Sequence, residues 1–213
     1  MRYGVFHTLQ KLSEGQSLAR IWMNVALAEE RISGKTVDIG GGRAPDYFAY
    51  LGRESGTDVE ALDGSISGIN FETDRLPYES GSVDTVLACN ILEHIYNHQH
   101  LLEEAKRILR SGGALVGFVP FWVGYHPDPN DYFRYTKEAL KRMLEDAGFT
   151  GISVREVGGG PFRANFNTLS LSIPRFLRPV LYPFYAGADD IMLSLRPKAH
   201  ERYPLGYVFT ARV

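Results

Sequence analysis

A chain of 213 residues is long enough to bury a complete core and is most simply one domain with insertions. Its 23 basic and 25 acidic residues give a net charge of −2, which makes nucleic acid an unlikely partner. The N-terminus lacks the charged-then-apolar pattern of a signal peptide, and no uncharged stretch is long enough to cross a bilayer. We therefore expect a cytoplasmic protein without a transmembrane segment.

The first part of the chain alternates helical and strand patterns. Residues 17–32 place apolar side chains on one helical stripe, with Ser17 as the N-cap, and this helix is predicted to cover a sheet. The following elements are predicted to be a strand over 35–39, a helix over about 45–53, a strand over 58–62 and a short strand near 69–72. The connection after Asp63 is too short for an ordinary crossover helix, so the fold is predicted to be abbreviated there.

The second part continues the alternation. Residues 83–89 are a nearly continuous apolar run, typical of a strand covered on both faces, and Cys89 within it is predicted to be a buried, reduced thiol. The later elements are predicted to be a helix over about 98–110, a strand over 114–119, a helix capped by Thr136, and strands over 152–157 and 207–213. The expected class is α/β, with a doubly wound, mostly parallel, seven-stranded Rossmann-like sheet and an antiparallel last strand.

The segment 38–44, Asp-Ile-Gly-Gly-Gly-Arg-Ala, reads as the end of a strand, a glycine turn and the start of a helix. Gly40 and Gly42 suit a turn with positive φ or a close approach of a ligand. Asp38 would repel a phosphate at this place but would attract an ammonium or sulfonium group. Pro45 stands where the dinucleotide fingerprint needs its third glycine, so that fingerprint is incomplete.

Asp38, Gly40 and Gly42 resemble the first motif of the class I S-adenosylmethionine-dependent methyltransferases, and further motifs follow over residues 35–157. The resemblance is to the small-molecule type, with a domain like that of the methyltransferases of ubiquinone and menaquinone biosynthesis. It implies S-adenosyl-L-methionine as the cofactor, held by the glycine loop, Gly41 included. One domain is then expected over 1–213, formed by a helical cover (1–34), the cofactor-binding core (35–157), an insertion (158–203) and the last strand (204–213).

Two acidic residues are implied to bind the adenosine part of the cofactor. Asp63 ends the second strand, where the family's acidic residue accepts hydrogen bonds from the ribose hydroxyls; the alternative is a loop aspartate that starts a turn. The segment 72–84 resembles the family's acidic residue, Leu-Pro-aromatic loop and entry to the fourth strand. Alignment on the Leu-Pro pair gives Glu72 the place of the aspartate that reads the adenine amino edge, with Asp74 as its competitor.

The stretch 90–95, Asn-Ile-Leu-Glu-His-Ile, resembles the family's segment after strand four. The resemblance implies that Asn90 lines the methionine end of the cofactor. Glu93 and His94 are candidates for a pair of groups near the transferred methyl, and the alternative is a helix-start carboxylate beside a structural histidine. No metal site is predicted, because His94 and the histidines after it lack a cysteine or clustered carboxylates to complete a ligand set.

Residues 120–136 form the most distinctive segment, too long for a plain strand-to-helix connection. The segment resembles the His-x-x-Pro-x-Asp-Tyr-x-Arg-Tyr-Thr loop of a bacterial subgroup of these enzymes. If the acceptor is a hydroxyl, a neutral His126 can take its proton while Asp131 holds the imidazole ring. The alternative is a self-packed loop in which Asp131 and Arg134 pair. Three loop residues are predicted to contact the substrate: Trp122, Tyr132 and Arg134.

The insertion 158–203 is aromatic and carries six basic against three acidic residues in an otherwise acidic chain. It is predicted to be a lid over a bulky or lipid-linked acceptor, a peripheral membrane contact or a homodimer contact; the alternative is an insert that simply packs on the core. The predicted function is methyl transfer from S-adenosylmethionine to a small-molecule, sugar or lipid-linked acceptor, at oxygen. The alternatives are a non-catalytic module that binds this cofactor or its product, and a nicotinamide-dependent oxidoreductase.

Overall fold

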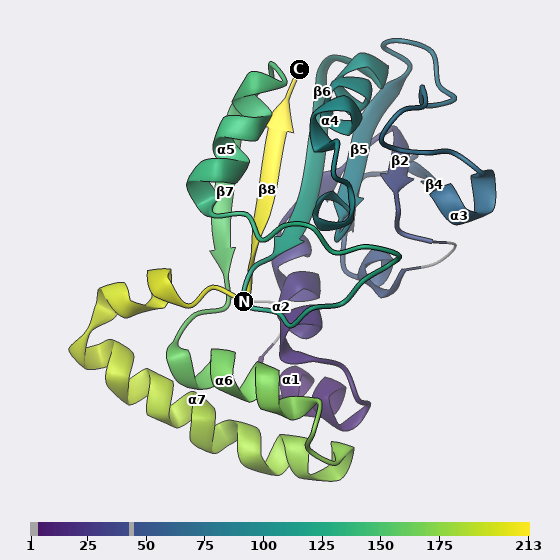
Figure 1. Ribbon diagram of the computed structural model, residues 1–213. Coiled ribbons are helices and arrows are strands. Elements are labelled where there is room, and N and C mark those ends of the chain that lie inside the picture. The colour runs from purple at the N-terminus through teal and green to yellow at the C-terminus, as the bar shows by residue number, and fades with distance from the viewer. Residues whose placement is uncertain (1–3, 43–44) are drawn as a thin grey trace.

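The computed structural model describes residues 4–42 and 45–213, so Arg43 and Ala44 of the glycine loop lie outside the described residues. The main sheet of the described chain has six strands in the order β4-β2-β5-β6-β8-β7 (Figure 1). The strands β4, β2, β5 and β6 are parallel, whereas β8 is antiparallel to both β6 and β7. Their bounds are β2 Lys35–Ile39, β4 Asp58–Leu62, β5 Val83–Cys89, β6 Leu109–Pro120, β7 Thr150–Val157 and β8 Gly206–Arg212.

The strand order creates a switch point between β2 and β5. From β2 the chain first adds β4 on one side and then returns to add β5 on the other. In register, Asp38 of β2 pairs with Ala61 of β4 and with Leu87 of β5. The residues that follow these strands, among them Gly40 and Asn90, therefore emerge at one edge of the sheet, where doubly wound folds bind ligands.

Helices cover both faces of the sheet (Figure 1). The helices α4 (His98–Ile108) and α5 (Lys137–Asp146) bury leucines on one face, and α2 (Leu18–Leu27) buries Met23 and Leu27 on the other. Two predicted caps are confirmed: Ser17 accepts a hydrogen bond from the Arg20 amide and Thr136 from the Ala139 amide, each at 3.2 Å. Within the described chain, no helix is both long and apolar enough to cross a membrane.

The insertion forms a helical layer beyond one end of the sheet, beside α1 (Val5–Ser13) (Figure 1). It contains α6 (Pro161–Ser170), the 3-10 turn η3 (Arg175–Leu177), α7 (Arg178–Leu195) and η4 (Pro197–Arg202). The buried carboxylate of Asp189 in α7 accepts the amides of Phe162 (3.0 Å) and Arg163 (2.6 Å) at the start of α6. This contact fixes the two helices to each other.

Two predicted helices differ from the observed elements: one is shorter, and the other is not an α-helix. The helix predicted over 17–32 ends at Leu27, because Arg31–Ile32 (β1) pairs in parallel with Gly52–Arg53 (β3). The helix predicted over 45–53 is also wrong: a 3-10 turn, η1 (Asp46–Ala49), occupies its first part and β3 its end. The fully buried Tyr47 anchors η1 against the sheet, which leaves too few residues for a regular helix.

The short strand predicted near 69–72 is wrong, and it accounts for the difference between seven expected and six observed strands. The chain there forms a turn in which the Asn70 carbonyl accepts the amides of Thr73 and Asp74. A four-residue helix, α3 (Gly64–Ser67), precedes the turn. The segment lies beyond β4 at the edge of the sheet, so no neighbouring strand of the described chain orders it.

Candidate active site

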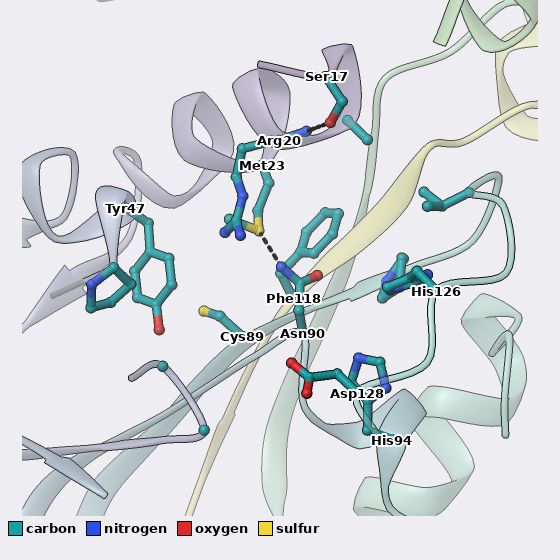
Figure 2. A pocket seen from close by; sticks show the side chains of 16 residues that line it. Ser17, Arg20, Met23, Tyr47, Cys89, Asn90, His94, Phe118, His126 and Asp128 are labelled. Carbon is teal, nitrogen blue, oxygen red and sulfur yellow. Dashed lines mark hydrogen bonds between the residues drawn. The ribbon is translucent and has the colours of Figure 1, made fainter. Parts of the chain in front are cut away.

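Two adjacent cavities open at the carboxyl ends of β2 and β5. The larger, about 620 Å³, extends from the end of β4 along the turn after α3. The smaller, about 320 Å³, lies between α2 and the 120–128 part of the loop, and its side chains are shown in Figure 2. Both cavities share four lining residues, Gly40, Asn90, His94 and Asp128. A ligand that passes over Gly40 and Asn90 would therefore occupy both.

The glycine loop is built for close approach. Gly40 and Gly42 have φ values of 80° and 67°, a region that favours glycine. A Cβ atom on Gly40 would lie 2.6 Å from the Ile91 side chain, and one on Gly41 would lie 1.8 Å from a carboxylate oxygen of Asp38. Neither glycine has room for a side chain, so bare backbone forms the boundary between the two cavities.

Asp38 lies behind this loop and does not line either cavity. Its carboxylate is fully buried and accepts the Tyr47 hydroxyl, which lies 2.9 Å from one oxygen and 2.7 Å from the other. Burial raises the pKa of Asp38 to about 7, although the hydrogen bond from Tyr47 acts in the opposite direction. When Asp38 is ionised, its charge would reach a ligand through the thin layer of Gly41.

The larger cavity contains both residues implied to bind adenosine. Asp63 follows β4 on its wall, and its Oδ1 accepts the Ile66 amide at 3.3 Å. Glu72 also lies on the wall, and its Oε1 accepts the Tyr96 amide at 3.1 Å. The competitor Asp74 does not line the cavity and instead accepts the Asn70 amide at 2.9 Å. The geometry favours Glu72 over Asp74 at this position.

Asn90 stands at the junction of the two cavities. Among the described residues, Asn90 is the only one other than glycine with a positive φ, which is 52°. Its Nδ2 lies 3.2 Å from the Met23 sulfur. A left-handed backbone at a non-glycine residue is strained and is found mainly where function or packing requires it. Here the strained backbone turns the chain from β5 along the cavity floor.

Comparison with known proteins finds a methyltransferase domain in this part of the chain. The family model of the methyltransferase domain matches residues 38–117, which extend from the glycine loop into β6. An uncharacterized methyltransferase of Mycobacterium sp. (strain JLS) is 28% identical over 204 residues, covering 84% of this chain and 77% of that protein. These findings indicate an enzyme that uses S-adenosylmethionine to transfer methyl groups.

The methyltransferase also resembles solved structures at low identity. The 1,6-didemethyltoxoflavin-N1-methyltransferase of Burkholderia thailandensis has a TM-score of 0.54 at 17% identity, over 98% of this chain and 86% of that one. Phosphoethanolamine N-methyltransferase 2 of Haemonchus contortus has a TM-score of 0.53 at 14% identity, over 100% of this chain and 58% of that one. Both were solved with S-adenosylhomocysteine bound. The likeness itself shows the class I fold.

A buried carboxylate and two imidazoles meet at the far end of the smaller cavity. Oε1 of the fully buried Glu93 lies 3.7 Å from Nε2 of His94 and 3.9 Å from Nε2 of His126. Burial raises the pKa of Glu93 to about 8. The backbone carbonyl of Glu93 accepts the amide of Tyr132 at 2.8 Å, which holds the loop against this segment. The structure thus brings together Glu93, His94 and His126 from two separate motifs.

The contacts of Asp131 differ from the predicted ones. Its carboxylate pairs with Arg134 at 2.5 and 2.7 Å, and Arg134 lowers the pKa of Asp131 to about 2. It accepts the backbone amide of His126 at 2.9 Å, but it lies 3.6 Å from the Nδ1 atom of that ring, beyond hydrogen-bond distance. Asp131 therefore holds the backbone of His126 and not its imidazole, as the self-packed alternative requires.

The three residues predicted to contact substrate lie away from both central cavities. Trp122 packs edge-on against Tyr203 of the insertion, with ring centroids 5.9 Å apart. Tyr132 packs against Tyr96 and, with Arg134, lines a shallow outer depression. Their positions suit contact with a part of an acceptor that extends out of the site, and not contact with its reacting atom.

Sequence reasoning missed several residues of the smaller cavity. Arg20 lies on the cavity-facing side of α2 and is 3.5 Å from the Asp46 carboxylate. Tyr47 also lines this cavity, and Asp128 lies near His94 at the junction (Figure 2). Arg20 stands among the polar positions of a helix recognised by its apolar stripe, and nothing in the local pattern distinguishes it. Asp128 falls on a variable position of the loop motif, which gave no signal.

Proposed function

We propose that this protein transfers the methyl group of S-adenosylmethionine to an oxygen atom of a small-molecule, sugar or lipid-linked acceptor. The observation that carries the proposal is the pair of joined cavities, one with the acidic residues for adenosine and one that ends at two imidazoles. Methyl transfer is an in-line displacement, so the donor and acceptor sites must meet at one point. Gly40 and Asn90 mark that point.

In the proposed complex the adenosine occupies the larger cavity, with Asp63 at the ribose and Glu72 at the adenine. The methionine part crosses Gly40 and Asn90 into the smaller cavity. Its ammonium would lie over Gly41 in the field of Asp38, and its carboxylate would face the guanidinium of Arg20, which lines the same wall. This pose places the sulfonium methyl toward His94 and His126.

Oxygen is favoured as the methylated atom because two imidazoles face the acceptor end. A hydroxyl must lose its proton when the new C–O bond forms, and a neutral imidazole is suited to that task near pH 7. His126 lines the smaller cavity, and its side chain remains 40% exposed. A substrate can therefore reach this ring, whereas Glu93 is fully buried behind it.

The acceptor is proposed to extend beyond the cavity. A volume of about 320 Å³ must hold the methionine part of the cofactor as well as the reacting end of the acceptor. Only a small portion of the acceptor fits, so the remainder would lie along the 120–136 loop and the insertion. An acceptor that extends out of the cavity supports the sugar or lipid-linked class.

The outer face of the insertion is proposed to contact an anionic membrane surface on the cytoplasmic side, with a homodimer contact as the competing explanation. Exposed apolar side chains recur every four or seven residues along η3 and α7; we call Phe176, Val180, Phe184, Ile191 and Leu195 the outer stripe. Exposed basic residues stand near both ends of the stripe: Arg175, Arg196, Lys198 and Arg202. An apolar stripe with flanking cations is typical of helices that lie in a membrane interface.

Calorimetric titration with S-adenosylhomocysteine, with NAD as the control ligand, tests the cofactor site. Asp63→Asn should weaken S-adenosylhomocysteine binding by roughly 10-fold or more, since hydrogen bonds to a charged group contribute about 1.5–3 kcal/mol. Asp58→Asn is the matched control, because this exposed residue begins the strand that precedes Asp63. Equal affinities of the two variants would contradict the assignment of Asp63. Binding of NAD would favour the oxidoreductase alternative.

Transfer of a labelled methyl group to acceptors in a cell extract tests the reaction itself. His126→Gln should reduce turnover by about 100-fold while S-adenosylhomocysteine affinity stays the same. Unchanged turnover would exclude a role of this imidazole in the chemistry. Cofactor binding without transfer to any acceptor would favour the non-catalytic module.

A further inference from the structure

Three metal-ligand atoms face one another at the acceptor end of the smaller cavity. They are Oε1 of Glu93, Nε2 of His94 and Nε2 of His126, and all three lie within 4.8 Å of one another. The first two residues follow β5 and the third comes from the 120–136 loop. No metal site was predicted from the sequence, because the search for ligands paired His94 with the histidines that follow it in the chain and not with His126.

Hydrogen bonds on the outer side of each ring leave the inner nitrogen free to bind. Nδ1 of His94 lies 2.6 Å from the Asn130 carbonyl, and Nδ1 of His126 lies 2.9 Å from the Gly124 carbonyl. A carbonyl only accepts, so in the neutral rings each Nδ1 carries the proton and each Nε2 presents a lone pair. Histidines that bind metals commonly donate their second N–H to a backbone carbonyl in this way.

The nearby Arg134 does not change this tautomer of His126. Its Nη2 atom lies 3.2 Å from Nδ1 of the ring, farther than the Gly124 carbonyl at 2.9 Å. The same Nη2 donates to Asp131 at 2.7 Å and to the Gly124 carbonyl at 3.2 Å. The arginine protons therefore have acceptors of their own, and the Nδ1 proton of His126 keeps its carbonyl.

Glu93 would supply the negative charge to a bound cation. Its side chain is fully buried, and among the residues that the structure describes neither carboxylate oxygen has a hydrogen-bond partner. A buried carboxylate without a partner is costly, and here it faces two nitrogen lone pairs that offer it no proton. The separations of 3.7 and 3.9 Å to His94 and His126 are too long for direct hydrogen bonds.

We propose that Glu93, His94 and His126 bind a divalent transition-metal ion of the zinc type. Imidazole nitrogens and one carboxylate are a ligand set that zinc and its neighbours prefer. At metal–ligand distances of about 2.0–2.2 Å and tetrahedral angles, ligand atoms lie about 3.4 Å apart. The Glu93–histidine separations exceed this value by a few tenths of an ångström, which small side-chain rotations remove.

The remaining coordination positions of the ion would face the smaller cavity, which His94 and His126 both line. Figure 2 shows Asp128 at the same end of the cavity. If the proposed methyl transfer holds, an acceptor hydroxyl binds the ion and gives its proton to solvent. Its oxygen then forms the bond to the methyl carbon as the C–S bond breaks, and sulfur keeps the electron pair. In that case His126 acts as a ligand and not as the base.

Cobalt titration of the full-length protein, purified with a chelator, tests the site directly. Co²⁺ should bind with one equivalent and give visible absorption bands, and Zn²⁺ should displace it. Glu93→Gln and His126→Asn should weaken Co²⁺ binding at least tenfold. His200→Gln, at an exposed histidine of the insertion, should leave it unchanged.

S-adenosylhomocysteine affinity, measured on each variant, reports whether the fold is intact. No Co²⁺ or Zn²⁺ binding by a wild-type protein that binds S-adenosylhomocysteine would overturn the metal site and favour a proton- or water-filled cluster. Metal binding that survives both cluster substitutions would place the ion elsewhere and also overturn it. Metal binding without S-adenosylhomocysteine binding would instead overturn the proposed function and leave the metal site standing.

Discussion

The edge of the sheet where β2 and β5 end and the outer face of the insertion depart in opposite ways from the usual distribution of side chains. The first buries ionisable groups, and the second exposes apolar ones. At the edge, the carboxyl groups of Asp38 and Glu93 are fully buried, which is costly. On the insertion, Phe176 and Phe184 are 71% and 72% exposed, although aromatic side chains gain stability from burial. We propose that the first region binds groups of opposite charge within a rigid frame and that the second presents apolar area to a partner. Changes in the two regions should therefore separate cofactor binding from surface binding.

The largest effect on cofactor binding is expected from Gly41→Ala. The new Cβ would lie 1.8 Å from the Asp38 carboxylate and 2.3 Å from the Tyr47 hydroxyl, so the loop must move. We expect S-adenosylhomocysteine affinity to fall roughly 100-fold, or about 3 kcal/mol, in a calorimetric titration. Overpacking should also lower the free energy of unfolding by about 1–3 kcal/mol in urea denaturation.

Gly187→Ala in the insertion is the matched control for that change. A Cβ atom at Gly187 meets nothing within 4 Å, and the residue lies inside α7. Alanine is the better helix former by about 1 kcal/mol, so this variant should be slightly more stable and should bind S-adenosylhomocysteine normally. If Gly41→Ala also bound normally, the glycine loop would not be the cofactor floor.

Asp38→Asn should give a smaller loss of affinity and the opposite effect on stability. Above about pH 7, where Asp38 is ionised, removing the charge below Gly41 should weaken S-adenosylhomocysteine binding about 10-fold, because the ligand carries an ammonium group. In the folded protein Asp38 keeps its proton up to about pH 7, whereas its ordinary pKa is 3.8. The unfolded chain therefore binds fewer protons, and this group lowers stability progressively between about pH 4 and pH 7.

The stability gain of Asp38→Asn should follow the same pH range. It should be small near pH 4, grow toward pH 7 and stay constant above it. The difference between 3.8 and about 7 corresponds to roughly 4 kcal/mol, an upper value because asparagine must also be buried. Urea denaturation of the ligand-free proteins at several pH values measures this gain. A pH-independent difference would show that Asp38 is already ionised in the folded state.

The parts of the fold that the sequence predicted correctly are those with strong local patterns. Strands over 35–39, 58–62 and 83–89 have the predicted bounds, since alternating or continuous apolar residues and the turns that follow mark them in the sequence. The strand near 69–72 was wrong because a strand needs a neighbour, and the sequence does not show that β4 is the edge. Tertiary pairing, as between β1 and β3, shortened a helix whose stripe looked continuous.

The site shows the same division. Gly40, Asp63 and Asn90 belong to motifs at strand ends, and the order of the strands alone places them at one edge. The contact between Glu93 and His126 depends on how the 120–136 loop folds back, through the hydrogen bond of the Tyr132 amide to Glu93. No spacing in the sequence encodes that contact. The predicted pairing of Asp131 with the ring of His126 failed because Arg134, three residues farther along the loop, takes the carboxylate.

The smallest effect on cofactor binding is expected from charges placed on the outer stripe. Phe176→Asp combined with Phe184→Asp changes two exposed side chains, so the free energy of unfolding should move by no more than about 0.5 kcal/mol each. S-adenosylhomocysteine affinity should not change. The doubly substituted protein should no longer float with anionic vesicles. The new carboxylates oppose both the burial of the outer stripe in the membrane and the attraction of its flanking cations to anionic lipids.

Zwitterionic vesicles and sedimentation distinguish the explanations for the stripe. The wild-type protein should float with anionic vesicles at low salt and should bind zwitterionic vesicles more weakly, since Arg175 and the basic residues near Arg196 supply part of the attraction. A wild-type protein that sediments as a dimer, and whose dimer the two substitutions dissociate, would instead assign the stripe to a second copy. A monomer that binds neither type of vesicle would leave the insertion as a lid that packs on the core, since its inner side already holds α2 through Asn167 and the Ala19 amide.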